Sequence, residues 1–262
     1  MHPSSGHRAG LSSLNPAPQA RADSPDAPTL ADEHTGLQQV RIVRHPLFGG
    51  QLFLDGDLQI SESDSAYGIA MVSPLLALRQ LSRVAILGGG DGGVLCELLR
   101  SLDPLPHTPR ELTMIEIDAR VVELSRRHLP AVGGDAFDDP RAQVRIGDAF
   151  AWIDQARDLD AVIYDLTMDP LREDQSRDEF VAHIVARIAR ALRPGGVISM
   201  QCCGHGRADP ADRIERRRLL PLIREAIDTH FSDRCEQDVL VPSYRDLWTF
   251  LSARKPAAAR AA

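Results

Sequence analysis

The stretch Val84-Ala-Ile-Leu-Gly-Gly-Gly-Asp-Gly-Gly-Val-Leu-Cys-Glu-Leu-Leu99 decides the fold, because an apolar run enters a glycine-rich turn and an amphipathic segment leaves it. Glycines at 88, 89, 90, 92 and 93 let the backbone bend tightly and approach a ligand closely, as nucleotide-binding turns after a first strand require. The turn lacks the Gly-Lys-Ser/Thr of a phosphate-binding loop, and the carboxylate of Asp91 would repel a pyrophosphate. The segment predicts a nucleoside that carries positive charge near Asp91, with tight strand-to-helix packing as the alternative.

Strands and helices alternate after this turn. Apolar runs predict strands at 84–87, 112–117, 144–146, 161–164 and 197–201, and helical spacing covers 92–101, 119–129, 149–157 and 174–192. This alternation predicts an α/β fold with a parallel sheet, which a final pair of runs at 239–241 and 248–252 could close. Before the turn, residues 38–57 show the pattern of short antiparallel hairpins, and a helix with an irregularity at Pro74 is expected over 66–80.

Composition narrows the class of protein. The chain has 262 residues, 43% of them hydrophobic, a formal net charge of -7 and no apolar run of membrane-spanning length. The charge argues against nucleic acid as the main partner and is compatible with a cationic substrate. Lys255 is the sole lysine, which excludes a lysine Schiff base within the core. The four cysteines show no metal-ligand spacing, and they favour a reducing cytoplasm.

The same composition suggests the domain boundaries. Residues 1–34 are rich in Pro, Ser, Ala and Gly and predict a disordered leader without the apolar core of a signal peptide. We expect an N-terminal β-hairpin domain with its connecting helix at 35–80, the main domain at 81–255 and a tail at 256–262.

Acidic residues lie at or just beyond the end of each of the first four predicted strands. They are Asp91, then Glu116 and Asp118, then Asp148, then Asp165, with Asp169 four residues beyond the last. Because ligands of open parallel sheets bind outside the carboxyl ends of the strands, we expect these acids to share one crevice.

Each acid also has a structural explanation. Glu116 is predicted to bind ribose hydroxyls, with Asp118 as a helix cap, whereas Asp148 fits an N-cap and adenine recognition about equally. Asp165 ends a buried strand and needs a partner or a function. Asp169 precedes a proline and could cap a turn or add a second carboxylate for a cation.

Together these residues resemble the polyamine aminopropyltransferases, the spermidine and spermine synthases. The likeness spans about residues 38–254 and rests on motifs in the right order: Gln38, Phe48-Gly, Leu54-Asp-Gly56, Gln59, Gly88-Gly-Gly-Asp-Gly-Gly93, Glu116-Ile-Asp118, Asp138-Asp-Pro-Arg141, Gly147-Asp148, Tyr164-Asp165, Asp169-Pro170, Arg193-Pro-Gly-Gly196 and Val241-Pro-Ser with Trp248. The resemblance implies a Rossmann-like methyltransferase-type sheet with a small N-terminal antiparallel β-domain, a homodimer or homotetramer, and no metal.

The resemblance also implies roles for individual residues. Those that would hold the thioadenosine part of decarboxylated S-adenosylmethionine are Gln38, Gly88, Gly90, Glu116, Asp148 and Ala149. Those that would face the amines are Tyr67, Asp91, Asp165 and Asp169. Asp165 would be the general base. Asp91 would pair with the donor's free ammonium and repel the carboxylate of intact S-adenosylmethionine.

Three positions depart from the family pattern. Tyr67-Gly68-Ile69 stands where the family usually has Tyr-His-Glu, and Leu37 stands where a tyrosine usually precedes the first glutamine. The segment Asp165-Leu-Thr-Met-Asp-Pro170 has one more residue between its acids than the usual Asp-Ser-Ser-Asp-Pro. The amine end has therefore diverged more than the nucleoside end.

The sequence thus predicts an enzyme that moves an aminopropyl group from decarboxylated S-adenosylmethionine to a di- or polyamine such as putrescine, with neither a nucleic-acid nor a membrane partner. One alternative is an N-methyltransferase that uses intact S-adenosylmethionine, since this fold hosts both reactions. The other is a non-catalytic binder of polyamines or nucleosides.

Overall fold

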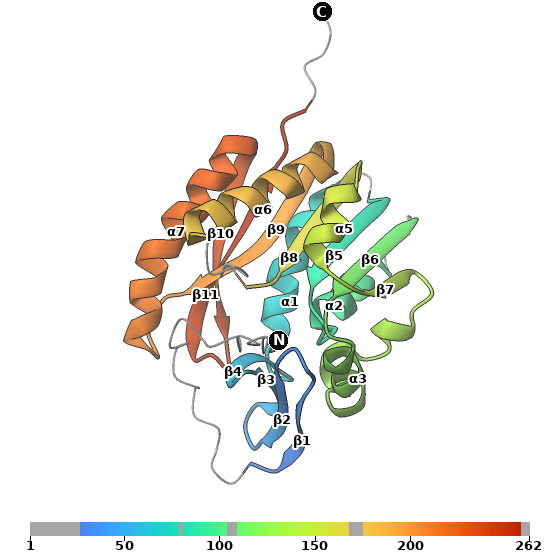
Figure 1. Cartoon of the computed structure of the whole chain (residues 1–262), viewed down its shortest axis with the longest axis vertical. Helices are drawn as coiled ribbons and strands as arrows, with labels where there is room; N and C mark the ends of the chain where they lie inside the picture. The colour runs from blue at the N-terminus through green and yellow to red at the C-terminus, as the bar shows by residue number, and fades with distance from the viewer. Residues whose placement is uncertain (1–26, 79–80, 104–108, 168–174, 258–262) are drawn as a thin grey trace, which may run out of the picture.

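The computed structural model describes residues 27–78, 81–103, 109–167 and 175–257, which form two β-sheets and their helices (Figure 1). The smaller sheet is antiparallel, with the order β1-β2-β3-β4. Its strands are β1 (Thr29–His34), β2 (Gln39–His45), β3 (Gly49–Leu54) and β4 (Asp57–Ser61). The 3-10 turn η1 (Ser73–Ala77) continues helix α1 (Ser65–Val72), which leads from this sheet to the larger one.

The larger sheet has seven strands in the order β10-β11-β9-β8-β5-β6-β7. Five are parallel: β5 (Arg83–Gly88), β6 (Glu111–Glu116), β7 (Ala142–Ile146), β8 (Leu159–Asp165) and β9 (Leu192–Gly204). The last two, β10 (Ser232–Val241) and β11 (Asp246–Arg254), are antiparallel at one edge.

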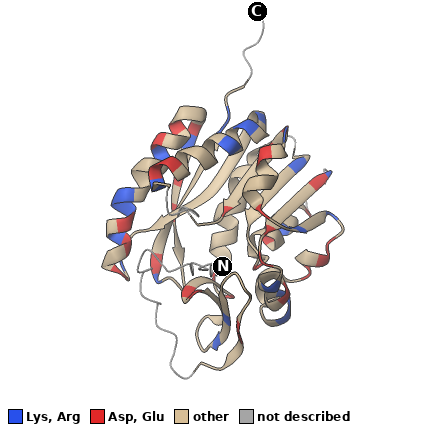
Figure 2. Ribbon diagram, in the orientation of Figure 1, with Lys and Arg blue, Asp and Glu red and all other residues tan. Residues whose placement is uncertain are grey.

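Helices cover both faces of this sheet (Figure 1). One face carries α1, α2 (Gly93–Leu102), α3 (Ala119–His128), the short α4 (Pro130–Gly133) and η2 (Ala136–Asp138). The other carries α5 (Ala149–Gln155), α6 (Arg177–Ala191) and α7 (Pro210–His230). Alternate side chains of β5 enter the two cores, because successive residues of a strand point to opposite faces: Val84 and Ile86 to one, Ala85 and Leu87 to the other. The charged residues gather on the outer helices and loops (Figure 2).

A buried aspartate ties the two sheets together. Asp64, just before α1, accepts hydrogen bonds from the amide of Ser61 in β4 at 2.8 Å and from the amide of Ser243 at 3.0 Å. Ser243 lies in the turn between β10 and β11. Since a buried carboxylate must be paired, these bonds fix the start of α1, and with it Tyr67, relative to the large sheet.

The predicted α/β fold with an N-terminal antiparallel sheet is confirmed, with three differences. The boundary of the predicted leader at residue 34 is wrong, because Thr29–His34 form β1 against β2. Of the helix expected over 66–80, the described part is α-helical to Val72 and a 3-10 turn at Ser73–Ala77, because Pro74 has no amide hydrogen to continue the α-helical hydrogen bonds. Helix α7 was not predicted, and Pro221 inside it interrupts the helical pattern. In the described part of the chain, no helix is long and apolar enough to cross a membrane.

Candidate functional site

The carboxyl ends of β5, β6 and β8 bring the predicted acids together. Gly88, the last residue of β5, pairs with Asp165, the last residue of β8, and Glu116 ends the neighbouring β6. Asp91 lies in the glycine turn that follows β5. The parallel strands thus place these side chains at one edge of the sheet, where ligands of open parallel sheets bind.

Asp165 forms the centre of this group. Its Oδ1 accepts a hydrogen bond of 2.6 Å from the hydroxyl of Tyr67 on α1, and the Tyr67 ring packs edge-on against Phe250 of β11 with centroids 5.1 Å apart. Burial, together with the negative charge of Asp91, raises the pKa of Asp165 to about 7, although the Tyr67 bond opposes the shift. Burial and the adjacent Asp165 also raise the pKa of Tyr67. The tyrosine is therefore a hydrogen-bond donor at neutral pH, and the aspartate is poised to exchange a proton.

Neighbouring atoms lie too close to the glycine turn for larger residues to occupy several of its positions. Gly88 has a φ of +84°, and a Cβ there would lie 2.3 Å from the carbonyl oxygen of Asp165. A Cβ on Gly90 would lie 2.8 Å from the Glu116 side chain, whose Oε2 accepts the Gly90 amide at 3.1 Å. Asp91 Oδ1 accepts the Gly93 amide at 2.7 Å, and burial raises the Asp91 pKa. Packing alone therefore explains Gly88 and Gly90, and their contacts with a donor stay predictions.

The N-terminal sheet reaches the end of β6. Gln38 Nε2 donates to Asp118 Oδ2 at 3.1 Å, and the Thr35 hydroxyl donates to the same oxygen at 2.6 Å. Asp118 Oδ1 accepts the amide of Arg120 at 3.0 Å, which confirms its predicted role as the cap of α3. Gln38 is therefore held at Asp118, two residues beyond Glu116, near the predicted binding site of the thioadenosine.

Glu116 holds the loop after β6 in place. Its Oε1 accepts the amide of Asp118 at 3.0 Å, and burial raises its pKa. Each of its oxygens thus accepts a backbone amide, which fixes the carboxylate at the carboxyl end of β6.

The remaining predicted residues are less well placed for binding. Asp148 Oδ1 accepts the amides of Phe150 at 2.7 Å and Ala151 at 3.3 Å, so it is the N-cap of α5. The Ala149 side chain is buried in the core, so a ligand contact from this residue would use its backbone. Asp169 lies outside the described residues.

Two groups of residues near these strand ends were not predicted. Gln201 of β9 donates to the Leu166 carbonyl at 3.1 Å and accepts from the Trp248 indole at 2.9 Å, so it fixes the segment after Asp165. Ile117 and Ile146, beyond the glutamate of β6 and at the end of β7, are 53% and 51% exposed. These residues could have been found from the sequence, because they lie at or near the carboxyl ends of predicted parallel strands, where ligands bind, although their side chains carry no charge.

The site has a marked excess of negative charge. Among the described residues, no Arg, Lys or His pairs with Asp91, Glu116 or Asp165, whose oxygens accept from backbone amides and the Tyr67 hydroxyl. The described residues also contain no group of three or more His, Cys, Asp or Glu side chains able to hold a metal ion. The charge must therefore be balanced by protons or by a cationic ligand.

Comparison with known proteins identifies the family. The sequence model of the spermine/spermidine synthase domain matches residues 68–259, most of the chain. The chain belongs to the spermine/spermidine synthase family. A polyamine aminopropyltransferase of Korarchaeum cryptofilum is 33% identical over 225 residues, which are 84% of this chain and 65% of that protein. One of Prochlorococcus marinus is 37% identical over 178 residues, 66% of this chain and 59% of that protein. The chain thus spans less than two thirds of the length of these two family members.

Solved structures of the spermine/spermidine synthase family share the fold. A spermidine synthase in complex with the transition-state analogue AdoDATO superposes with a TM-score of 0.71 at 24% identity, over 88% of this chain and 73% of that one. The spermidine synthase of Thermotoga maritima gives a TM-score of 0.70 at 23% identity, with the same coverage. The methyltransferase-type architecture implied by the sequence resemblance is therefore confirmed.

Proposed function

We propose that this chain is an aminopropyltransferase that transfers the aminopropyl group of decarboxylated S-adenosylmethionine to a di- or polyamine such as putrescine. The observation that carries the proposal is a set of three carboxylates without a cationic partner among the described residues: Glu116, which is buried, and Asp91 and Asp165, which are half-buried. A sulfonium donor and an ammonium acceptor supply the missing positive charge. The names of the relatives, polyamine aminopropyltransferases, support the same reaction.

Asp165 is the general base of the proposed reaction. An ammonium has no lone pair, so the acceptor must lose a proton before it attacks. A carboxylate whose pKa is about 7 can take that proton near neutral pH, and the Tyr67 hydroxyl 2.6 Å away orients it. The nitrogen lone pair then forms a bond to the carbon next to the sulfonium, the carbon–sulfur bond breaks, and its electrons return to sulfur. The products are the N-aminopropyl amine and 5′-methylthioadenosine.

The donor is proposed to lie across the ends of β5, β6 and β7. Glu116 and Gln38 would contact the ribose region, while the exposed side chains of Ile117 and Ile146 offer an apolar surface to the adenine. Asp91 would pair with the ammonium of the aminopropyl tail. In this arrangement Asp91 disfavours intact S-adenosylmethionine, because the additional carboxylate of that donor would face the partly desolvated Asp91 carboxylate.

Mass spectrometry of purified protein incubated with the decarboxylated donor and a panel of amines tests the proposal. Formation of 5′-methylthioadenosine and an amine heavier by one aminopropyl group is expected, and Asp165→Asn should abolish it while 5′-methylthioadenosine still binds. Full activity of Asp165→Asn would exclude this base. Assembly into a homodimer or homotetramer stays a prediction, which sedimentation equilibrium would test.

A further inference from the structure

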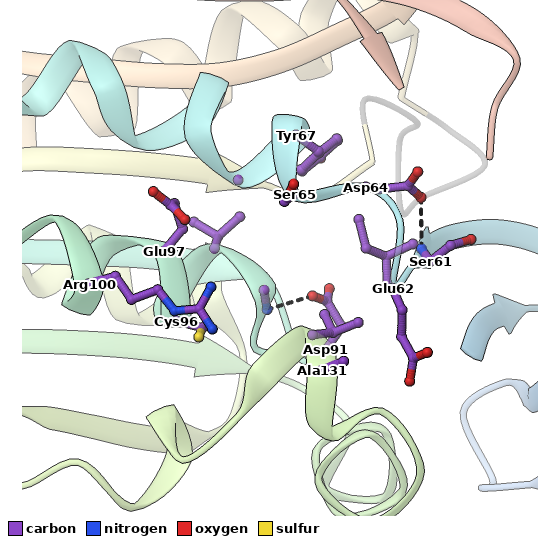
Figure 3. Close-up of a pocket in the computed structure, with 15 residues that line it drawn as sticks. Ser61, Glu62, Asp64, Ser65, Tyr67, Asp91, Cys96, Glu97, Arg100 and Ala131 are labelled. Atoms are coloured by element: carbon purple, nitrogen blue, oxygen red, sulfur yellow. Dashed lines mark hydrogen bonds between the residues drawn. The ribbon is translucent and has the colours of Figure 1, made fainter. Parts of the chain in front are cut away.

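A cavity of about 50 Å³ opens beside the glycine turn, between α1, α2 and the start of α4 (Figure 3). Apolar side chains such as Ile60, Val94 and Val132 form part of its wall. Tyr67 and Asp91 line it as well, so it borders the group of residues around Asp165. Its size suits roughly three or four water molecules, or the end of one aliphatic chain.

The absence of a side chain at Gly68 opens one wall of this cavity. Gly68 follows Tyr67 directly in α1. A Cβ on Gly68 would lie 3.2 Å from the Cβ of Glu97 and 3.4 Å from the Gly93 carbonyl oxygen. No larger side chain could therefore occupy this position without displacing Glu97, and the glycine leaves the Glu97 carboxylate facing the cavity (Figure 3).

Glu97 retains an unused acceptor. Its Oε1 accepts a hydrogen bond from the Ser101 hydroxyl at 3.2 Å, and Oε2 accepts none from the described residues. The other carboxylates in the wall are more fully engaged: Asp64 accepts bonds from Ser61 and Ser243, and Glu62 pairs with a surface arginine 2.8 Å away. Glu97 and Asp91 are thus the carboxylates that remain available to a ligand here.

The charge of the lining selects the ligand. The cavity lining contains four carboxylates, Glu62, Asp64, Asp91 and Glu97, and one guanidinium, Arg100, at the Glu97 end (Figure 3). Arg44, outside the lining, already pairs with Glu62, and the other three carboxylates leave an excess of negative charge. Arg100 forms no ion pair with a described residue, so it neutralises little of this charge. An aliphatic chain ending in an ammonium matches both the apolar wall and the negative charge.

We propose that Glu97 binds an alkylammonium group that enters the cavity past Gly68, and so is a determinant of amine specificity. The inference rests on the proposed function in that the ammonium belongs to a substrate of that reaction. Two substrates can supply it: the aminopropyl tail of the donor, or the distal end of the acceptor amine.

Calorimetric titration of the full chain tests this assignment and separates the two sources. The ligands are decarboxylated S-adenosylmethionine, putrescine or cadaverine added to the 5′-methylthioadenosine complex, and 5′-methylthioadenosine alone, which has no ammonium. Glu97→Gln preserves the shape of the side chain and removes its charge, so it should weaken ammonium ligands about tenfold or more. It should leave 5′-methylthioadenosine unchanged. Arg100→Gln, from the same end of the cavity, should tighten the same ammonium ligands.

A loss confined to the donor assigns the site to the donor tail, and a loss confined to the diamines assigns it to the acceptor; either supports the inference. Unchanged ammonium binding in Glu97→Gln overturns it, as does equal weakening of 5′-methylthioadenosine or a wild-type chain that binds no ammonium ligand. Gly68→Ala adds a variant that keeps the charge and narrows the entrance, and it should weaken the same ligands. If ammonium ligands bind through Glu97 but no product forms, the proposed aminopropyl transfer is refuted and the role of Glu97 in binding stands. If product forms and ammonium binding does not depend on Glu97, only the role of Glu97 is refuted.

Discussion

The raised pKa of Asp165 predicts that removing its charge stabilises the protein while it ends catalysis. The shift from 3.8 to about 7 means that ionising Asp165 in the folded chain costs free energy that the unfolded chain does not pay. At about 1.4 kcal/mol per pKa unit, the penalty is roughly 2–4 kcal/mol, the lower figure allowing for relaxation around the Asp91–Asp165 pair. Asp165→Asn removes this penalty and still accepts from Tyr67.

The sign of the pH dependence follows from the direction of the shift. Between pH 4 and pH 7 the folded chain binds the Asp165 proton more tightly than the unfolded chain, so this carboxyl lowers stability as pH rises. At pH 8 the whole penalty is present. Asp165→Asn should therefore raise the unfolding temperature by roughly 5–10 °C at pH 8, and the gain should nearly disappear at pH 4.

Thermal and urea unfolding followed by circular dichroism measure this difference. Asp148→Asn is the matched control, because Asp148 is an exposed N-cap just after β7, at the far edge of the sheet, and asparagine caps helices equally well. It should change stability by less than about 0.5 kcal/mol at either pH. An Asp165→Asn protein that unfolds at or below the wild-type temperature at pH 8 would refute the claim that Asp165 is held with a raised pKa.

Three further predictions concern the pH profile, the N-terminal sheet and the glycine turn. The kcat/KM of aminopropyl transfer should fall as the pH drops below about 7, because Asp165 becomes protonated. Tyr67→Phe should shift this fall to higher pH, because the tyrosine hydrogen bond lowers the Asp165 pKa. A fall in kcat/KM that begins only near pH 4 would contradict this. Asp118→Ala should lower the free energy of unfolding in urea by roughly 1–3 kcal/mol and weaken the binding of 5′-methylthioadenosine, because it removes the α3 cap and the hydrogen bonds to the β1–β2 turn. Asp118→Asn should keep the cap. Gly88→Ala should destabilise the fold by more than about 2 kcal/mol, whereas Gly147→Ala, where a Cβ would meet nothing within 4 Å, should be near neutral.

The strand-end acids illustrate what the sequence can predict. Alternation of apolar runs and helical segments is a local pattern, and the topology of parallel sheets then brings Asp91, Glu116 and Asp165 to one edge without further information. The predicted cap at Asp118 follows equally from local spacing. For Asp148 the sequence left two roles open, and the structure shows the cap.

Contacts between distant segments could not be read from the sequence. The Tyr67–Asp165 bond joins residues 98 positions apart, and the Gln38–Asp118 bond joins residues 80 apart, so both depend on how the two sheets pack. Strand β1 was missed because the polar sequence Thr29–His34 shows little apolar alternation, and β2 alone defines its register. The sequence does not single out Glu97, because this residue lies on an ordinary amphipathic helix and its exposure to the cavity depends on a glycine in another helix.

The role of Asp91 in donor choice is tested by a calorimetric comparison of decarboxylated and intact S-adenosylmethionine with wild-type protein and Asp91→Ala. The wild type should prefer the decarboxylated donor by at least about tenfold, and the variant should lose this preference because the carboxylate that rejects the intact donor is gone. Equal or tighter binding of intact S-adenosylmethionine by the wild type would contradict the role of Asp91 and would favour methyl transfer.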